Sequence, residues 1–275
     1  MKTDKYIALA NRSVIEITGP ESRNFLQGLI TNDVENVDES QAIYAALLTP
    51  QGKYLHDFFI IQLETKLLLD CRADRINELL ARLNRYKLRA KVEIKEASAE
   101  WSIYAIFVAK IREKNKKLAD EGVCFIDPRH EALGYRAILP ADTIPKSIPS
   151  EGMITEYDSL RLSLGIPEDS LDMLPEKIYP LEARLDEFNA ISFNKGCYVG
   201  QEVTIRMKHR NLVKKRLFPV SLSAEVKWGT TIEFQGKNAG EILSGQGKIA
   251  IALLRVDLAD NEELMAGDTK VLPLK

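Results

Sequence analysis

The stretch that says most about this chain runs from Lys195 to Glu202 and reads Lys-Gly-Cys-Tyr-Val-Gly-Gln-Glu. Two glycines flank the Cys–Tyr pair, so the backbone can turn tightly and come close to a ligand. Lys195 before Cys197, and Arg206 after it, would favour the reactive thiolate form if they approach it in space. Gln201 and Glu202 offer an amide and a carboxylate, which suit the donor and acceptor edge of a heterocycle. Residue types alone leave a structural, inert thiol equally open.

Length and composition limit the classes of protein. The chain has 275 residues, enough for one large domain or two to three small ones that share a core. Hydrophobic residues make up 45% and charged residues 28%, as in globular proteins. The formal charge of −2 gives no reason to expect a nucleic acid partner held by bulk electrostatics.

The cysteines and the apolar runs indicate where the chain works. The beginning has no apolar signal-peptide region, and no apolar run reaches the length of a membrane span, so no membrane association is expected. Cys71, Cys124 and Cys197 are scattered and form no C-x-x-C pair. This pattern argues against a disulfide framework and against a self-contained metal site, and it predicts a reducing compartment, most simply the cytoplasm.

The apolar patterns of the first half alternate between strand and helix periods. Ile76, Leu79, Leu80 and Leu83 recur at helical spacing within a helix predicted over residues 73–86. A shorter helix is predicted after Pro20, with residues 25, 26, 29 and 30 on one face. Strands are predicted at residues 13–18, 43–48, 54–63, 67–71, 92–94 and 101–108. This order predicts an α+β fold with a sheet covered on one face.

The second half changes character twice. Residues 140–149 contain three prolines and resemble a linker, and a helix is predicted over 156–164, before Gly165-Ile166-Pro167. Short strands separated by glycines follow at residues 217–222, 230–234, 240–244 and 248–256. Their spacing predicts a small β-barrel of about 60 residues.

Several segments together resemble one family. Residues 180–186 (PLEARLD), 191–194 (ISFN), the octet and Arg206 resemble the motif region of the YgfZ/IBA57 family. These folate-binding proteins are related to the glycine-cleavage aminomethyltransferase, the T-protein (GcvT). Further matching segments are residues 19–20, 25–28, 31–33, 48–53, 127–129, 133–134, 161, 165–167 and 210–216, the last close to the IBA57-like form. The resemblance therefore spans most of the chain.

The resemblance implies a fold and a function. It implies intertwined GcvT-like α+β subdomains in residues 1–215 (1–40 plus 150–215, and 41–149), with a C-terminal β-barrel at 216–275. Tetrahydrofolate, or a derivative, would occupy a central channel. The implied function is assembly or repair of [4Fe–4S] enzymes, including radical enzymes that modify tRNA, and the implied partners are cluster carriers or client proteins. With one motif cysteine, no stably bound iron–sulfur cluster is expected in isolation.

The same resemblance assigns site residues. Cys197 becomes the reactive thiol, and the folate-binding residues carried over are Asn32, Asp33, Lys195, Gly196, Tyr198, Gly200, Gln201, Glu202 and Arg206. Asn32 and Asp33 have a second interpretation, as caps of a helix end. Where T-proteins carry two adjacent acidic residues, this chain has His56 and Asp57. Asp57 is the remaining catalytic candidate, and His56 is expected to face solvent.

Three functions follow from these assignments. The single carboxylate favours a cluster-maintenance protein over a tetrahydrofolate-dependent aminomethyltransferase-like enzyme, which needs a positioned carboxylate for proton handling. The third is an interaction protein that keeps the pocket as a relic. The basic run at residues 206–216 is either solvated surface or a landing site for a polyglutamate folate tail or an acidic partner.

Overall fold

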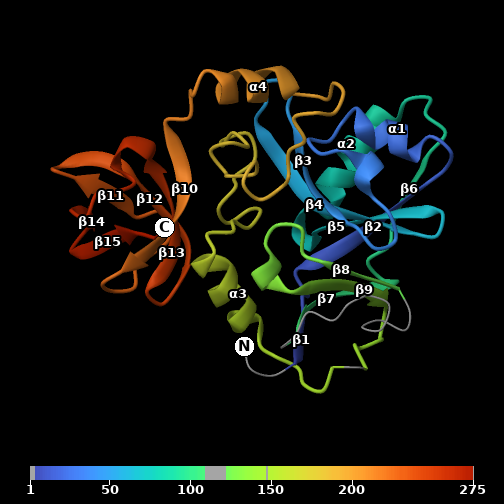
Figure 1. Ribbon diagram of the computed structural model, residues 1–275, viewed down its shortest axis with the longest axis horizontal. Coiled ribbons are helices and arrows are strands. Elements are labelled where there is room, and N and C mark those ends of the chain that lie inside the picture. The colour runs from blue at the N-terminus through green and yellow to red at the C-terminus, as the bar shows by residue number, and fades with distance from the viewer. Residues whose placement is uncertain (1–3, 109–121, 147, 275) are drawn as a thin grey trace. The chain divides into compact units, whose positions relative to one another are not determined.

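The computed structural model describes residues 4–108, 122–146 and 148–274 (Figure 1). The chain forms two compact units, and each is built from separate stretches of sequence. Unit 1 contains Met1–Leu48, His56–Tyr157 and Phe188–Val199, and unit 2 contains Thr49–Leu55, Asp158–Glu187 and Gly200–Lys275.

The larger sheet has the strand order β3-β4-β5-β2-β6. Its strands are β2 (Arg12–Thr18), β3 (Ile43–Leu48), β4 (Tyr54–Leu63), β5 (Lys66–Arg72) and β6 (Glu93–Glu96). One face packs against helices α1 (Ser22–Gln27) and α2 (Ile76–Lys87) (Figure 1). Because side chains alternate along a strand, Ile15, Phe58 and Leu69 join this core while their neighbours point to the opposite face.

The second sheet of unit 1 has the order β1-β7-β9-β8, and every neighbouring pair is antiparallel. Its strands are β1 (Lys5–Ala8), β7 (Trp101–Phe107), β8 (Val123–Ile126) and β9 (Tyr135–Pro140). Tyr135, Ala137 and Leu139 enter an apolar cluster on one face. Arg136, between them in β9, therefore points to the other face and reaches Asp70 of the larger sheet.

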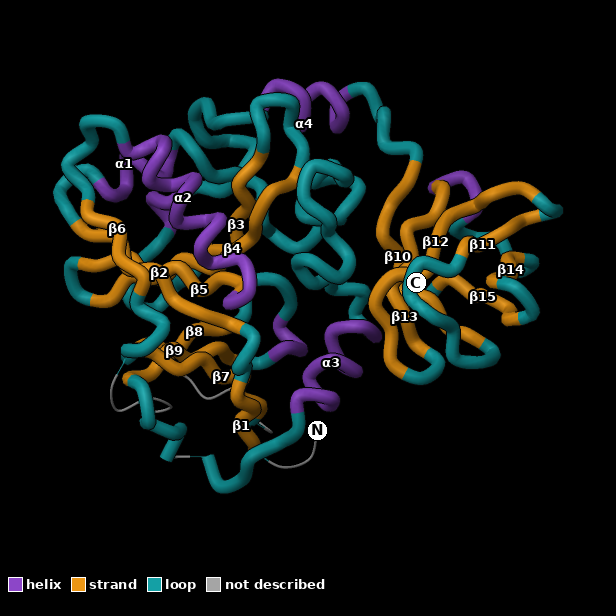
Figure 2. The backbone as a smooth tube through the Cα atoms, turned by 180° about the vertical axis from the view of Figure 1, so that it is seen from behind, coloured by secondary structure: helices purple, strands orange, loops and turns teal. Residues whose placement is uncertain are grey.

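Unit 2 contains a closed barrel of order β10-β13-β12-β11-β14-β15 (Figure 2). Its strands are β10 (Lys215–Leu222), β11 (Thr231–Phe234), β12 (Lys237–Gln246), β13 (Ile249–Arg255), β14 (Leu264–Ala266) and β15 (Thr269–Pro273). Apolar residues such as Val220, Ile242 and Leu254 fill its interior. The remaining helices are α3 (Ile154–Ser163) and α4 (Gln201–His209), and short 3-10 turns are η1 (Val34–Asn36), η2 (Ala73–Arg75), η4 (Glu131–Leu133) and η5 (Val256–Leu258).

The α+β class and the C-terminal barrel are confirmed. The predicted strands and helices are present with ends shifted by a few residues, except that the first helix ends at Gln27, before the apolar Leu29 and Ile30. Further elements that were not predicted from the sequence are β1, β8, β9, α4, β14 and β15. The grouping of residues 1–40 with 150–215 stays a prediction. No helix of the described residues has the length and hydrophobicity needed to cross a membrane.

Candidate functional site

Lys195 anchors the motif loop to the segment that follows α1. Its ammonium donates to the carbonyl oxygens of Gln27 (2.8 Å), Ile30 (2.9 Å) and Asn32 (2.7 Å). A lysine ammonium has three protons, so these carbonyls use its full donor capacity. Burial lowers the pKa of Lys195 to about 8, and the charge of Asp33 opposes that shift. The ammonium thus satisfies the carbonyls left open after α1, a role that the sequence analysis did not foresee.

Cys197 lies between two anchored residues. Lys195 holds the loop before it, and the backbone N–H of Val199 donates to the carbonyl of Gly28 (3.2 Å) after it. Cys197 is exposed, whereas Cys71 and Cys124 are buried. Burial raises the pKa of Cys124 to about 12, which keeps that thiol protonated and unreactive. Among the described residues, Cys197 is therefore the one thiol that is accessible to another molecule.

The residues around Cys197 combine an open side with a packed side. A side-chain carbon at Gly196 would meet no atom within 4 Å, so the loop is open there. Tyr198 is buried, and its ring centroid lies 5.2 Å from the Lys195 ammonium, a cation–π distance. Gly200 has φ of +83° and begins α4, a left-handed conformation that favours glycine. The octet therefore presents its thiol on a short, constrained loop.

Asn32 and Asn189 join three segments next to a pocket. The amide of Asn32 donates to the carbonyls of Tyr44 and Asn189, both at 2.8 Å. The amide of Asn189 donates to the carbonyl of Pro128 (2.9 Å). Asn189 and Tyr44 were not among the site residues predicted from the sequence. The left-handed backbone of Asn189, φ +57°, suits asparagine, but the sequence alone did not reveal it.

The pocket beside Asn32 has a volume of about 630 Å³, within the range of small-molecule sites. It belongs entirely to unit 1 and has no charged side chain in its lining. The lining combines amide and hydroxyl side chains with apolar ones, a mixture that is common in small-molecule pockets. The lining residues are Asn32, Asn36, Ser40, Gln41, Ala42, Ile43, Ile126, Pro128, Asn189, Ile191 and Ser192.

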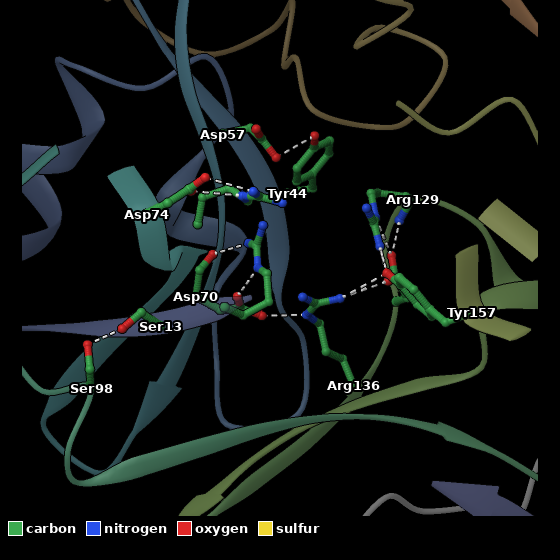
Figure 3. A network of polar contacts seen from close by, with 12 residues as sticks. Ser13, Tyr44, Asp57, Asp70, Asp74, Ser98, Arg129, Arg136 and Tyr157 are labelled. Atoms are coloured by element: carbon green, nitrogen blue, oxygen red, sulfur yellow. Dashed lines mark hydrogen bonds and ion pairs between the residues drawn. The ribbon is translucent and has the colours of Figure 1, made fainter. Parts of the chain in front are cut away.

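Asp33 and Asp57 are both engaged by neighbouring groups. Asp33 caps η1, because its carboxylate accepts from the backbone N–H of Glu35 (3.1 Å), and it also accepts from the Gln27 amide (2.8 Å). Asp57 is 3% exposed and accepts from the Tyr44 hydroxyl at 2.8 Å (Figure 3). Burial, and then the charge of Asp57, raise the pKa of Tyr44 well above its usual value, so Tyr44 stays a hydrogen-bond donor.

A buried charged network fills the space between the two sheets of unit 1 (Figure 3). Asp70 of β5 accepts from Arg12 of β2 at 2.6 Å and from Arg136 of β9. Burial alone would raise the pKa of Asp70, but the two guanidinium groups outweigh burial and hold that pKa below its usual range. Asp70 therefore stays ionised and ties the larger sheet to the smaller one.

The network continues through Asp127 and Arg129, which the family resemblance had singled out. Arg129 pairs with Asp127 at 2.8 Å and donates to the Tyr157 hydroxyl at 2.7 Å. The Phe59 ring lies close to three guanidinium groups, with 4.1 Å from its centroid to Arg136 and 4.8 Å to Arg129. The buried guanidinium groups are stabilised because carboxylates and an aromatic face replace the water that would otherwise surround them. Pro128, between the paired residues, is thereby held at the pocket wall.

The expectation that His56 faces solvent is wrong. His56 is 2% exposed and lies on the face of β4 that packs toward α2, with Nε2 3.6 Å from a Glu78 oxygen. Burial, and then the charge of Arg75, lower the pKa of His56 to about 3, so it is neutral near pH 7 and forms no ion pair with Glu78. Strand β4 is buried on both faces, so sequence alternation no longer indicates exposure.

The other predicted site residues belong to unit 2. Gly200 precedes α4, and Gln201 and Glu202 occupy its first turn. Arg206 lies in its last turn, where cations complement the helix dipole. The contacts above unite Asn32, Lys195 and Tyr198 within unit 1. Among the described residues, no group of three or more His, Cys, Asp or Glu side chains is arranged to hold a metal ion.

Comparison with known proteins defines the class first. Residues 8–125 match the model of the GCVT N-terminal domain, and residues 214–275 match that of the CAF17 C-terminal beta-barrel domain. The solved glycine cleavage system aminomethyltransferase T of Bartonella henselae superposes with a TM-score of 0.76 at 15% identity, over 99% of this chain and 85% of that one. The fold is therefore that of the GcvT-like aminomethyltransferases.

Curated relatives then define the family. The mitochondrial iron-sulfur cluster assembly factor IBA57 of Mus musculus is 30% identical over 96% of this chain and 83% of its own length. The IBA57 of Homo sapiens is 30% identical over 90% of this chain and 76% of its own length. A homolog from Coccidioides immitis is 33% identical over 79% of this chain and 56% of its own length. This chain belongs to the IBA57 family. These relatives are named as mitochondrial, so a cytoplasmic location for this chain stays a prediction.

Proposed function

We propose that this chain is an iron–sulfur cluster assembly factor that acts on [4Fe–4S] enzymes, including radical enzymes that modify tRNA, through Cys197 and a bound folate. The observation that carries the proposal is the identity of 30% with an assembly factor over 96% of the chain. The exposed thiol on a loop anchored at both sides gives that function a chemical group. Cys197 is the contact point for a cluster, its carrier or a client protein.

The number of accessible thiols limits how an iron–sulfur cluster can be bound. An iron–sulfur cluster is held by about four protein ligands, usually thiolates. The described part of the chain offers one exposed cysteine and no metal-ligand cluster. A cluster at Cys197 therefore takes its remaining ligands from a carrier or client, which makes the interaction transient.

The pocket beside Asn32 is our candidate site for tetrahydrofolate. The pterin ring of folate presents amide-like donors and acceptors on a flat frame, and the pocket lining offers amides, hydroxyls and apolar walls without charge. The folate carboxylates belong outside such a lining, because burial of unpaired charge is costly. Folate here would act as a bound cofactor of the assembly function.

Calorimetric titration tests the folate part. Wild-type protein should bind tetrahydrofolate with a Kd in the micromolar range. Gln41→Trp places a bulky side chain on the pocket rim and should weaken binding at least tenfold, whereas Gln246→Trp, on the barrel, should not. Absence of binding by the wild type at high micromolar folate, or equal binding by Gln41→Trp, would contradict the assignment.

The buried state of Asp57 separates this function from aminomethyl transfer. Its carboxylate is occupied by Tyr44, and Asp57 does not line the pocket. Turnover of tetrahydrofolate with an aminomethyl donor, lost in Asp57→Asn, would support a transferase instead. We expect no such turnover in the wild type.

A further inference from the structure

A groove lies on the barrel of unit 2, where β10 begins and β13 ends. Its volume is about 600 Å³, and its lining is Val213, Lys214, Lys215, Arg255, Val256 and Asp257. The two walls are joined by backbone pairing: Lys215 lies opposite Arg255, and the N–H of Val256 donates to the carbonyl of Lys214 at 3.0 Å. The groove therefore lies at the hydrogen-bonded ends of two neighbouring barrel strands.

Apolar groups are exposed in and next to this groove. Val256 is 42% exposed in the lining, and Leu212, immediately before the groove segment, is 46% exposed. Val213 between them in sequence lines the groove as well. Exposed aliphatic side chains gathered at a concave site gain free energy when a partner's apolar group covers them.

Cations dominate the rim. Lys214 and Lys215 are exposed, and within the described part of the chain neither forms an ion pair with a carboxylate. Lys215 faces Arg255 across the strands, a like-charge arrangement that an anionic partner relieves. The one carboxylate of the lining, Asp257, is engaged by Arg255 at 3.1 Å. The groove thus combines exposed apolar side chains with a net positive charge.

We propose that this groove docks an acidic segment of a partner protein, with one aliphatic side chain of that segment against Val256 and its carboxylates on Lys214 and Lys215. The exposed Val256 side chain favours one of two anionic occupants. A polyglutamate folate tail has carboxylates but no aliphatic side chain, so it leaves Val256 uncovered. The proposal concerns unit 2 alone and holds whether or not folate or Cys197 takes part in the proposed function.

Binding of an acidic peptide to the full chain tests the docking proposal directly. The probe is a fluorescent peptide of sequence Glu-Glu-Leu-Glu-Glu, followed by anisotropy at low salt. Lys214→Glu/Lys215→Glu should weaken binding at least tenfold, because both rim charges reverse, and added salt should weaken wild-type binding. Lys237→Glu/Lys248→Glu makes the same charge change elsewhere on the barrel and should bind within about twofold of wild type.

Two further measurements distinguish docking in the groove from general attraction between opposite charges. Val256→Asn keeps the net charge and should weaken binding of the leucine peptide about threefold or more, by removing apolar contact. A peptide with serine in place of leucine, and γ-linked pentaglutamate, should both bind more weakly than the leucine peptide. Equal binding by either of these two, no effect of Val256→Asn, or equal losses in both double variants would overturn the proposal.

Discussion

At the scale of single residues, the most informative side chain is Lys195. Three carbonyl contacts hold the motif loop, and the loss of the ammonium would release them. Lys195→Met keeps the aliphatic stem but no donor, so we expect faster amide hydrogen exchange at residues 28–32 and 196–199. Lys53→Met is the control, because it removes a half-buried lysine whose ammonium donates to a different carbonyl, that of Lys177 at 3.1 Å. Unchanged exchange in Lys195→Met would show that the anchor is dispensable.

His56 gives a prediction about pH. Its pKa of about 3 in the folded protein lies below the usual 6.5, so between these values the unfolded chain binds a proton that the folded chain does not. The contribution of this neutral histidine is complete above pH 6.5 and is lost as pH falls toward 3, by on the order of 5 kcal/mol. His56→Leu should flatten the pH dependence of unfolding free energy there.

The matched control for that measurement is His209→Leu. His209 is exposed in the last turn of α4, so His209→Leu replaces a histidine at the surface rather than in the core. The comparison uses the difference between each variant and the wild type, because carboxylates titrate in the same range. An identical slope in His56→Leu and wild type would contradict the buried, neutral state of His56.

At the scale of elements, the two sheets of unit 1 depend on the buried network. Asp70→Asn leaves Arg12 and Arg136 without their carboxylate in a site closed to water. Removing one member of a buried ion pair costs about 3–5 kcal/mol, and we expect a loss of that size in denaturant unfolding. Asp74→Asn breaks an exposed pair with Arg72 and should cost no more than about 1 kcal/mol. Similar losses in both variants would refute this role of Asp70.

Helices and strands differ in how well local sequence patterns predict them. Barrel strands β10 to β13 and helix α2 follow from local period and turn residues, so the sequence predicted them, whereas the short strands β14 and β15 were missed. Arg136 and Asp70 are 66 positions apart in the sequence, and their pairing arises only when the two sheets face each other. Arg136 lies on β9, a strand that was not predicted, so local sequence patterns could not indicate its contact with Asp70. The octet located Cys197, while the part played by Lys195 required the fold.

At the scale of the whole molecule, family and site support one function. The chain has the GcvT-like fold, and its IBA57 relatives are named as iron–sulfur cluster assembly factors. Its one exposed cysteine is held on an anchored loop. The central claim is that Cys197 is required for cluster assembly and not for folding.

Complementation of a deletion strain tests this claim most directly, by measuring the activity of its [4Fe–4S] enzymes. Wild-type protein should restore activity, and Cys197→Ala should restore none, although it is soluble and has the thermal stability of the wild type. Cys124→Ala, which replaces a buried thiol, is the matched cysteine control and should restore activity in proportion to the folded protein present. Full restoration by Cys197→Ala would contradict the account.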